Sequence, residues 1–528
     1  MPQKVRAKLA VLILCLLMNL ASIAGEQANP SAAAIASAHP LATDAGLTVL
    51  AKGGNAFDAA VAVSAALAVV EPYSSGLGGG GFWLLHRAKD GYQVMIDGRE
   101  KAPSKAHADM YLDKKAEVIP GLSMDGPLAA GIPGTPAALV HIATHYGKLP
   151  LKESLDPAMR LARDGFQVDT RYQRMAGFRL NALRASEEAA AIFLHANQVP
   201  PLGYVIRQKE LAATLRSIAR KGVAGFYHGR VAKVLVDGVQ AAHGIWTMRD
   251  LADYQIVERK PLQARYRDII ITTAPPPSSG GIAILTMLNI LATYPAQDLS
   301  PSHKTHVIIE AMRRAYRDRA AYLGDPDFVH IPTAMLIHPL YAQGLRHSIH
   351  DQKATPSVLL PGPVDTDIKA QNTTHFSILD REGNRVSATL SINYPFGCGF
   401  VAPQTGVLLN DEMDDFVAKP MTANSYGLVG GEANAIAAGK RPISSMTPTF
   451  LDGTQGVGIL GTPGGSRIIT MLLLGILDYA DGSLPAHWVS LPRFHHQYLP
   501  DRVQYEANAF TSGQKEDLTG YGHELQQL

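Results

Sequence analysis

Hydrophobic positions are spaced differently in the two halves of the chain. In the segment 40–72, Ala, Val and Leu fill two helical stretches that are separated by a pair of glycines. Asn55 stands where an N-cap belongs, Asp58 follows three residues later, and Pro72 ends the second stretch. The pattern predicts two helices, and the second is apolar on all sides, as a buried helix is.

Helical spacing dominates the middle of the chain, from about 135 to 345. Its longest pattern, KTHVIIEAMRRAYRDRAAYLGDPDF, has apolar residues at a helical period, charged residues opposite them and Gly324 at the expected end. Earlier in the chain, SSGLGGGGFWLLHR predicts a flexible turn that runs into a strand, and YQVMID predicts its partner strand. Beyond 366 the spacing changes to two, and further strands are expected at 457–460 and 447–451. Helices first and strands second predict an α+β or layered α/β fold.

The segment HFSILDREGNRVSATLSIN predicts a β-hairpin with two different faces. If DREGN (380–384) is a symmetric connection, Thr373 lies opposite Ser391, and Asn393 follows two residues later on the same face. The other face is apolar and predicts the core side of the sheet. A solvent-exposed Ser/Thr-rich face is the alternative for the polar side. The remaining polar pairs expected are His375 with Thr389 and Ser377 with Ser387.

Length and charge narrow the class of protein. The chain has 528 residues, of which 46% are hydrophobic, and Lys+Arg 48 against Asp+Glu 46 gives a formal charge of +2. Such a balance lacks the basic surface that nucleic-acid binding requires. The length corresponds to about three or four domain-sized masses, or to one or two closely packed larger units. The composition therefore predicts a globular protein with a large core.

The first 24 residues have the features of a secretory signal peptide. Three cations precede an apolar run from Leu9 to about Met18, and the small residues Ser22 and Ala24 mark a cleavage site. The apolar run is shorter than a membrane span, so an uncleaved anchor is the less favoured alternative. Cleavage leaves Cys398 as the sole cysteine, which excludes an intrachain disulfide and is typical of a buried apolar thiol.

Two motifs could bind a dinucleotide or a metal ion, but neither has the neighbouring elements or partner residues that such a site needs. The glycines of GLGGGG (Gly76 to Gly81) follow a helix and precede a strand, whereas a dinucleotide site needs the opposite order. These glycines are expected to give room for close backbone approach. The pair His495 and His496 has no partner ligands at a useful spacing, so no metal site and no cofactor are expected.

Three short segments carry candidate chemistry. Gly464 and Gly465 lie in a turn between a strand and an apolar helix, where their amides can hold an anion or a developing oxyanion, or can form a structural turn. The segment 409–416 holds four carboxylates, and 440–446 holds two hydroxyls after a cationic pair. Facing each other, these two segments can bind the ammonium and the carboxylate of an amino acid; separately, each is more often a solvated loop.

Together these strings resemble the γ-glutamyltranspeptidase family, also called glutathione hydrolases. The resemblance runs from about Pro40 to Pro500, nearly the whole chain after the signal peptide. The matching strings are PLATDAGLTVLAKGGNAFDAAVA, EPYSSGLGGGGF, DGREKAP, YLGDPDF, TTHFSILDREGNRVSATLSIN, FGCGF, TGVLLNDEMDDF, YGLVGGEANA, KRPISSMTPT, GTPGGSRIIT and PRFHHQYLP.

The resemblance implies an N-terminal-nucleophile hydrolase fold, a four-layer αββα sandwich, made as an inactive precursor that cuts itself. By analogy the cut lies between Asn372 and Thr373. A freed α-amino group has a pKa near 7.7–8.0 and can act as base for the threonine hydroxyl. The implied division is a signal peptide 1–24, a large subunit 25–372 and a small subunit 373–528.

The resemblance also assigns roles to individual residues. Thr373 would be the nucleophile of both self-cutting and catalysis, and Ser391 takes a position that is usually threonine and contacts it. Gly464 and Gly465 would form the oxyanion hole. The residues implied to bind substrate are Arg99, Ser444 and Ser445 for the α-carboxylate, Asn393, Glu412 and Asp415 for the α-ammonium, and Tyr426 as a lid residue.

The implied reaction is attack on a γ-glutamyl amide such as glutathione, with transfer of the γ-glutamyl group to water, an amino acid or a dipeptide. The mature protein would be an exported, periplasmic or secreted pair of subunits with no stable membrane span and no nucleic-acid partner. Family members continue beyond the position of Leu528 with a final strand pair, so an unpaired sheet edge is expected here.

Two other functions are left open by the sequence. One is an exported amidohydrolase of the same fold that acts on poly-γ-glutamate or on β-lactam side chains. The other is an uncut, non-catalytic binding protein. Arg99, Ser444, Ser445 and Asp415 favour a substrate with a free α-amino acid head group, and therefore favour the transpeptidase reaction.

Overall fold

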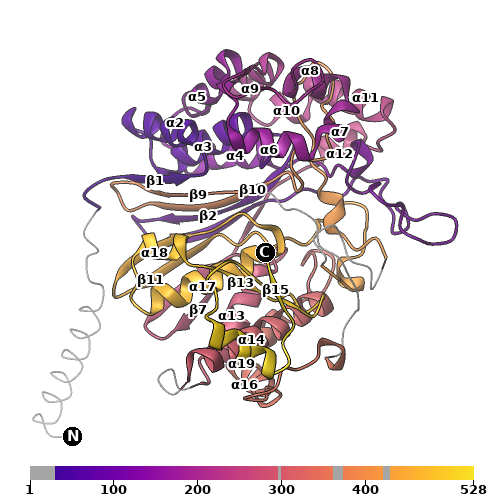
Figure 1. The fold of residues 1–528 in the computed structure, drawn as a ribbon. Coiled ribbons are helices and arrows are strands. Elements are labelled where there is room, and N and C mark those ends of the chain that lie inside the picture. Colours follow the sequence, from indigo (N-terminus) through magenta and orange to yellow (C-terminus); the bar gives the residue numbers. More distant parts are fainter. Residues whose placement is uncertain (1–29, 295–298, 361–372, 420–427) are drawn as a thin grey trace, which may run out of the picture.

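Two antiparallel sheets lie face to face at the centre of the molecule, and helices cover their outer faces (Figure 1). The computed structural model describes residues 30–294, 299–360, 373–419 and 428–528. The expected signal peptide, Asn372 and Tyr426 lie outside these residues. The arrangement is the four-layer αββα sandwich that the sequence resemblance implied.

The larger sheet combines strands from both ends of the chain. Its order is β1-β9-β10-β2-β3-β6, and every neighbouring pair is antiparallel. The hairpin β9–β10 lies inside this sheet, because β9 also pairs with β1 and β10 also pairs with β2. The strands are β1 (Ala34–Ser37), β9 (Thr374–Leu379), β10 (Arg385–Ser391), β2 (Gly80–Arg87), β3 (Tyr92–Gly98) and β6 (Val257–Arg259).

The smaller sheet has the order β12-β11-β8-β7 and is also antiparallel. Its strands are β12 (Gly456–Leu460), β11 (Thr449–Gly453), β8 (Ile269–Thr273) and β7 (Leu262–Tyr266). The expected strand at 457–460 is present, and the one at 447–451 begins at Thr449. The region 135–345 is mostly helical, as predicted. It also contains β6, β7 and β8, which the helical spacing did not predict; β6 and β8 pair with strands far away in the sequence.

Helices of the first half of the chain cover the larger sheet, on the upper side of Figure 1. The helix α3 contacts both β9 and β10. The helices of this layer are α2 (Pro40–Ala51), α3 (Ala56–Val70), α4 (Thr135–His145), α5 (Leu151–Asp164), α6 (Thr170–Phe178), α7 (Leu180–Arg184), α8 (Glu187–Phe193), α9 (Lys209–Lys221), α10 (Ala224–Tyr227), α11 (Gly229–Ala241) and α12 (Met248–Ala252), with the short pair β4 (Phe166–Gln167) and β5 (Val205–Ile206).

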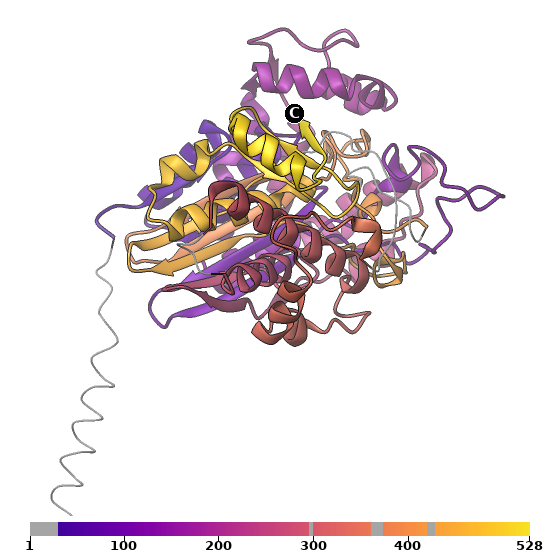
Figure 2. The ribbon, with the colours of Figure 1, turned by 60° about the horizontal axis from the view of Figure 1, so that its bottom comes forward.

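The second helical layer covers the smaller sheet on the lower side of Figure 1. Its helices are α13 (Gly280–Leu291), α14 (Pro301–Tyr322), α15 (Thr333–Leu336), α16 (Pro339–His347), α17 (Ile468–Ala480), α18 (Pro485–Ser490) and α19 (Ser512–Gly520). The C-terminal segment, yellow in Figure 2, lies against this layer, where α19 packs on α14 and the Ser302 hydroxyl donates to Asp517 over 2.5 Å. A small sheet of β13 (Phe494–His495), β14 (Val503–Tyr505) and β15 (Leu525–Gln527) belongs to the same segment.

Alternating side chains of the larger sheet divide the interior into two cores. Trp83 and Leu85 of β2 belong to the core under α3, whereas Phe82 and Leu84 belong to the core that contains the smaller sheet. Both faces of the sheet are therefore buried. No helix among the described residues is long and apolar enough to cross a membrane.

The local signals around α3 form as predicted. The Asn55 side chain accepts hydrogen bonds from the backbone amides of Phe57 and Asp58, and the Asp58 carboxylate accepts one from the Asn55 backbone amide over 3.0 Å, which completes a capping box. Every residue of α3 is buried. The predicted buried helix is thus confirmed.

The glycine-rich segment after α3 gives the room that was expected of it. A Cβ atom on Gly78 would lie 2.0 Å from the Leu408 carbonyl oxygen, and one on Gly79 would lie 2.2 Å from that of Ser391. Real side chains cannot adopt such contacts, so glycine lets this segment pass directly beside the end of β10.

Helix α14 differs from the expected amphipathic helix. Charged residues that were expected opposite its apolar side are buried: Arg314 is 0% exposed and its Nη1 lies 2.5 Å from Glu310 Oε2. Ion pairing, rather than solvation, satisfies these groups. The helix therefore lies inside the protein, close to the site described next.

Candidate active site

Thr373 and Ser391 lie opposite each other at the end of the central hairpin. The register of β9 and β10 pairs Thr374 with Leu390 and His375 with Thr389, so the expected pairing is confirmed, and Thr373 and Ser391 are the next positions. Both are nearly buried, at 3% and 5% exposure. Two hydroxyls are thus held side by side at the end of a rigid sheet element.

The polar face of the hairpin is not exposed to solvent. It packs against the smaller sheet, where the Ser387 hydroxyl donates to the Leu460 carbonyl over 2.8 Å. His375 lies between Thr389 and Ser377, and burial lowers its pKa to about 3. Its ring is therefore neutral and both of its nitrogens are engaged, so it is not available as a base for Thr373.

Asn393 continues the line of polar groups beyond Ser391. Its backbone amide donates to the Ser391 Oγ over 2.7 Å, and its side-chain amide donates to the Asp411 carbonyl over 3.0 Å. Asn393 adopts a φ of +70°, a left-handed conformation that asparagine tolerates better than most residues. This turn brings the chain from β10 toward the acidic segment.

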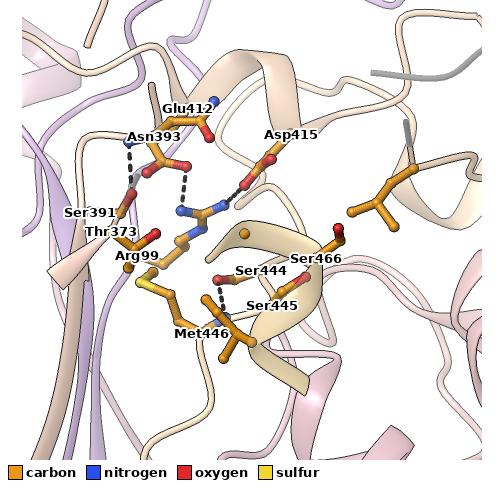
Figure 3. Close-up of a pocket in the computed structure, with 13 residues that line it drawn as sticks. Arg99, Thr373, Ser391, Asn393, Glu412, Asp415, Ser444, Ser445, Met446 and Ser466 are labelled. Atoms are coloured by element: carbon orange, nitrogen blue, oxygen red, sulfur yellow. Dashed lines mark hydrogen bonds and ion pairs between the residues drawn. The ribbon is translucent and has the colours of Figure 1, made fainter. Parts of the chain in front are cut away.

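Arg99, directly after β3, is the cation at the centre of the site. It is 1% exposed, and its guanidinium lies 2.5 Å from Glu412 and 2.5 Å from Asp415 (Figure 3). It also donates to the backbone carbonyls of Pro442 (3.2 Å) and Ile443 (3.0 Å). The acidic segment and the serine segment therefore meet on one arginine, as the sequence predicted for facing loops.

The acidic groups around Arg99 are crowded and buried. Burial raises the pKa of Glu100 to about 8, and it raises the pKa of Glu412 well above its usual range, although Arg99 opposes both shifts. One oxygen of each carboxylate has no hydrogen-bond partner among the described atoms. Such groups are prepared to accept hydrogen bonds from a cationic ligand.

The serine segment is fixed from behind. The Ser444 Oγ accepts a hydrogen bond from the Met446 amide over 3.1 Å, and the Ser444 carbonyl accepts two from Ser279, through its amide (2.7 Å) and its hydroxyl (2.8 Å). Ser444 is 2% exposed and Ser445 is 9% exposed. Both side chains line the same cavity as Arg99.

The glycine turn lies between β12 and α17. Gly464 and Gly465 have φ values of +138° and +53°, which non-glycine residues rarely adopt. The Tyr316 hydroxyl donates to the Ser466 carbonyl and thereby holds the turn against α14. Gly465 lines the cavity, whereas Gly464 is beside it and is not among the lining residues.

One small cavity collects these groups (Figure 3). It brings together nine of the residues singled out from the sequence: Arg99, Thr373, Ser391, Asn393, Glu412, Asp415, Ser444, Ser445 and Gly465. Sequence reasoning missed four further lining residues, of which Met446 and Ser466 adjoin predicted ones, while Leu428 and Ile468 carry no polar signal. The arrangement presents a hydroxyl nucleophile beside a site for the two charges of an amino acid.

Cys398 and His495, which could have indicated a thiol nucleophile or a metal site, are held in packing and hydrogen-bonding environments. Cys398 is buried, and burial raises the pKa of its thiol to about 12, which excludes a thiolate nucleophile at neutral pH. His495 hydrogen-bonds to Thr470 and Gln497, each over 2.8 Å. These residues act in packing and hydrogen bonding, as the sequence indicated.

A cluster of metal-ligand types occurs elsewhere among the described residues. His306, Glu310 and His523 place their ligand atoms within 4.8 Å of one another. Both oxygens of Glu310, however, bind Arg313 and Arg314, so two cations already neutralise the carboxylate. These residues do not fit a metal ion well.

Comparison with known proteins gives consistent similarities. The sequence profile of the family described as Gamma-glutamyltranspeptidase matches residues 42–528. A glutathione hydrolase proenzyme of Pseudomonas sp. (strain A14) is 43% identical, over 98% of this chain and 91% of that protein. The glutathione hydrolase proenzyme of Escherichia coli (strain K12) is 42% identical, over 89% of this chain and 82% of that protein.

Solved structures are similar as well. A cephalosporin acylase from Bacillus halodurans matches with a TM-score of 0.83 at 28% identity, over 95% of this chain and 89% of that chain. A γ-glutamyltranspeptidase from Helicobacter pylori matches with a TM-score of 0.60 at 40% identity, over 62% of this chain and 94% of that chain.

Proposed function

The chain belongs to the γ-glutamyltranspeptidase family, and we propose that it is a glutathione hydrolase and γ-glutamyltransferase that uses Thr373 as nucleophile. The observation that carries this proposal is the single cavity shared by Thr373, Arg99 and the carboxylates of Glu412 and Asp415. The cavity combines an attacking hydroxyl with a binding site for an amino acid head group. A γ-glutamyl amide carries such a head group at its glutamyl end.

Thr373 acts first on its own chain. Its hydroxyl oxygen attacks the carbonyl carbon of Asn372, an ester replaces the peptide bond, and water hydrolyses that ester to a carboxylate at Asn372 and a free amine at Thr373. The products are a large subunit, 25–372, and a small subunit, 373–528. Before this cut the α-amino base does not exist, so the precursor is inactive toward substrate.

In the mature enzyme the α-amino group of Thr373 accepts the hydroxyl proton while the oxygen attacks the γ-carbonyl carbon. Gly464 and Gly465 donate backbone N–H groups to the oxyanion that develops. The departing amine takes the proton, which leaves the γ-glutamyl group as an ester on Thr373. Water or an acceptor amine then attacks this ester through the same geometry, with Ser391 beside the reacting oxygen.

Arg99, Ser444 and Ser445 bind the α-carboxylate of the substrate, and Asn393, Glu412 and Asp415 bind its α-ammonium. In the uncut chain Glu412 and Asp415 are themselves paired with Arg99. Substrate binding therefore exchanges ion pairs. The substrate carboxylate pairs with the Arg99 guanidinium, and the substrate ammonium pairs with the carboxylates that Arg99 then no longer holds. The family resemblance assigns Tyr426 the role of a lid residue.

The precursor carries a signal peptide, residues 1–24, and the protein acts after export, in the periplasm or outside the cell. Its acceptors are water, amino acids and dipeptides. No cofactor takes part in the reaction, because the nucleophile, its base and the oxyanion donors all come from the chain itself.

Turnover of L-γ-glutamyl-p-nitroanilide and glutathione by the purified protein tests the proposal, with p-nitroaniline and cysteinylglycine as products. Thr373→Ala should remain one uncut chain without turnover, and Ser391→Ala should slow both cutting and turnover. Normal cutting of Thr373→Ala would exclude Thr373 as the nucleophile.

An acylase for β-lactam side chains is the second candidate, because the cephalosporin acylase structure is similar over 95% of this chain. The two functions differ in the head group that they need. A transpeptidase requires the α-ammonium and the α-carboxylate, so deamino-γ-glutamyl (glutaryl) p-nitroanilide should be turned over at least tenfold more slowly than the γ-glutamyl compound. Faster turnover of the glutaryl compound would favour the acylase.

A further inference from the structure

Helix α14 contacts one wall of the candidate active site directly and a second wall through Ser279, with two residues on one of its faces. Tyr316 and Arg319 are three positions apart and therefore neighbours on the helix. Tyr316 holds the glycine turn through its hydrogen bond to Ser466. The Nε–H of Arg319 donates to the Ser279 Oγ over 3.0 Å.

Ser279 links Arg319 to the serine segment. Its hydroxyl and its amide both donate to the Ser444 carbonyl, over 2.8 and 2.7 Å. The guanidinium of Arg319 is thus one side chain away from the segment that carries Ser444 and Ser445. These contacts place a positive charge directly behind the proposed carboxylate site.

Arg319 has no ion-pair partner among the described residues, although it is only 6% exposed. Other arginines of α14 are paired: Arg314 binds Glu310, and Arg317 lies 3.3 Å from Asp318. Apart from Nε–H, the four remaining N–H groups of Arg319 have no hydrogen-bond partner there. Asp415 is the nearby carboxylate that acts on the Arg319 charge, without a direct ion pair. A buried cation without a direct ion pair is costly, and it favours binding of an anion nearby.

The surroundings of Arg319 connect it to the substrate site. It lines a second, small cavity that shares Asp415 and Leu428 with the cavity that contains Thr373. Asp415 is already paired with Arg99. Arg319 therefore lies beside the head-group site, on the far side of a carboxylate that another arginine neutralises.

The charge balance of the site requires such a residue. Arg99 supplies one positive charge and is contacted by the carboxylates of Glu412 and Asp415. Asp415, and Glu412 when it is ionised, repel a substrate carboxylate that approaches this group, and repulsion is strong in a poorly hydrated space. A second cation offsets that repulsion.

We propose that Arg319 is the second cation of the α-carboxylate site, a specificity-determining positioning residue that acts through Ser279 and the serine segment. The inference rests on the proposed function and adds a residue to it. It follows that loss of the Arg319 charge weakens the binding of substrates that carry an α-carboxylate and spares substrates in which that group is neutral.

Arg319→Gln tests this, because glutamine keeps an N–H donor for Ser279 and removes the charge. The two substrates are L-γ-glutamyl-p-nitroanilide and its α-carboxamide counterpart, measured at the same pH on enzyme whose cut is verified by gel. KM for the carboxylate substrate should rise roughly tenfold or more. KM for the carboxamide should change less than about twofold, and kcat for both less than about threefold.

Arg317→Gln is the matched control. Arg317 lies on the same helix, is paired with Asp318 and lines neither cavity. It should leave the carboxylate preference unchanged. Arg319→Lys keeps the charge and should keep KM for the carboxylate substrate within about threefold of the unaltered enzyme, which also covers the case in which Arg319→Gln does not fold.

An equal rise of KM for both substrates in Arg319→Gln would show a merely structural role and overturn the inference. So would a folded Arg319→Lys enzyme that loses the preference for the carboxylate substrate. Absence of γ-glutamyl turnover in the unaltered, folded protein is a different result: it contradicts the proposed function, and the inference falls with it.

Discussion

Replacing Arg99 with methionine should damage both binding and stability, because Arg99 neutralises groups that remain buried. Methionine fills similar space but has neither charge nor donors. In its absence, Glu412 loses a 2.5 Å ion pair and so does Asp415, and the carbonyls of Pro442 and Ile443 lose their donors. Breaking a buried pair from one side costs about 3–5 kcal/mol, since the remaining charge has no partner.

Stability is best measured in a Thr373→Ala background, where the uncut single chain unfolds without separation of subunits. Arg99→Met should lower the free energy of unfolding by about 3–5 kcal/mol at pH 7. In enzyme that is able to cut itself, kcat/KM for a γ-glutamyl anilide should fall roughly 100-fold or more, because the α-carboxylate loses its cation.

A second substitution separates this reasoning from a packing defect. Adding Glu412→Gln removes one of the orphaned acidic groups, so the double variant should recover about 1 kcal/mol or more relative to Arg99→Met alone. If the double variant lost unfolding free energy equal to the sum of the two single variants, the argument would be refuted, because the two side chains would then not interact.

Three further predictions concern other parts of the fold. Gly461→Ala should lower stability by about 1–3 kcal/mol, because the new Cβ would lie 2.0 Å from the His375 ring; a denaturation midpoint measures this, and an unchanged midpoint would contradict it. Asn55→Ala removes the cap of α3 and should cost about 1 kcal/mol by the same measurement, and a stabilised variant would be inconsistent with the capping role. Glu100→Gln should flatten the dependence of stability on pH. Burial raises the pKa of Glu100 from 4.5 to about 8, so the folded chain keeps a proton that the unfolded chain loses, and stability falls as pH rises across that window. A Glu100→Gln profile as steep as the original would exclude Glu100 as the titrating group.

Local sequence signals predicted the elements that form from local interactions. The symmetric DREGN connection correctly fixed the register of β9 and β10, because a short turn leaves little freedom in the pairing. The cap at Asn55 and the apolar pattern of α3 were equally local. The positions of Thr373 and Ser391 followed from the hairpin alone.

Contacts between distant segments could not be read from local patterns. The strands β7 and β8 are five residues each, and β8 pairs with β11, whose partner positions lie far along the chain. The charged side of α14 resembled a solvated face, yet its residues are buried, and the helix packs against α13 and against α19 of the C-terminal segment. Arg319 was therefore missed, since only the tertiary structure shows that it has no direct ion pair among the described residues.

The amino-terminal sequence of the purified, folded protein tests the central claim most directly. Intact mass spectrometry with N-terminal sequencing should find two polypeptides, the smaller of which begins at Thr373, and γ-glutamyl turnover should appear as the cut proceeds. A single uncut chain that hydrolyses γ-glutamyl amides would contradict the account, because Thr373 would then have no free amine to accept its proton.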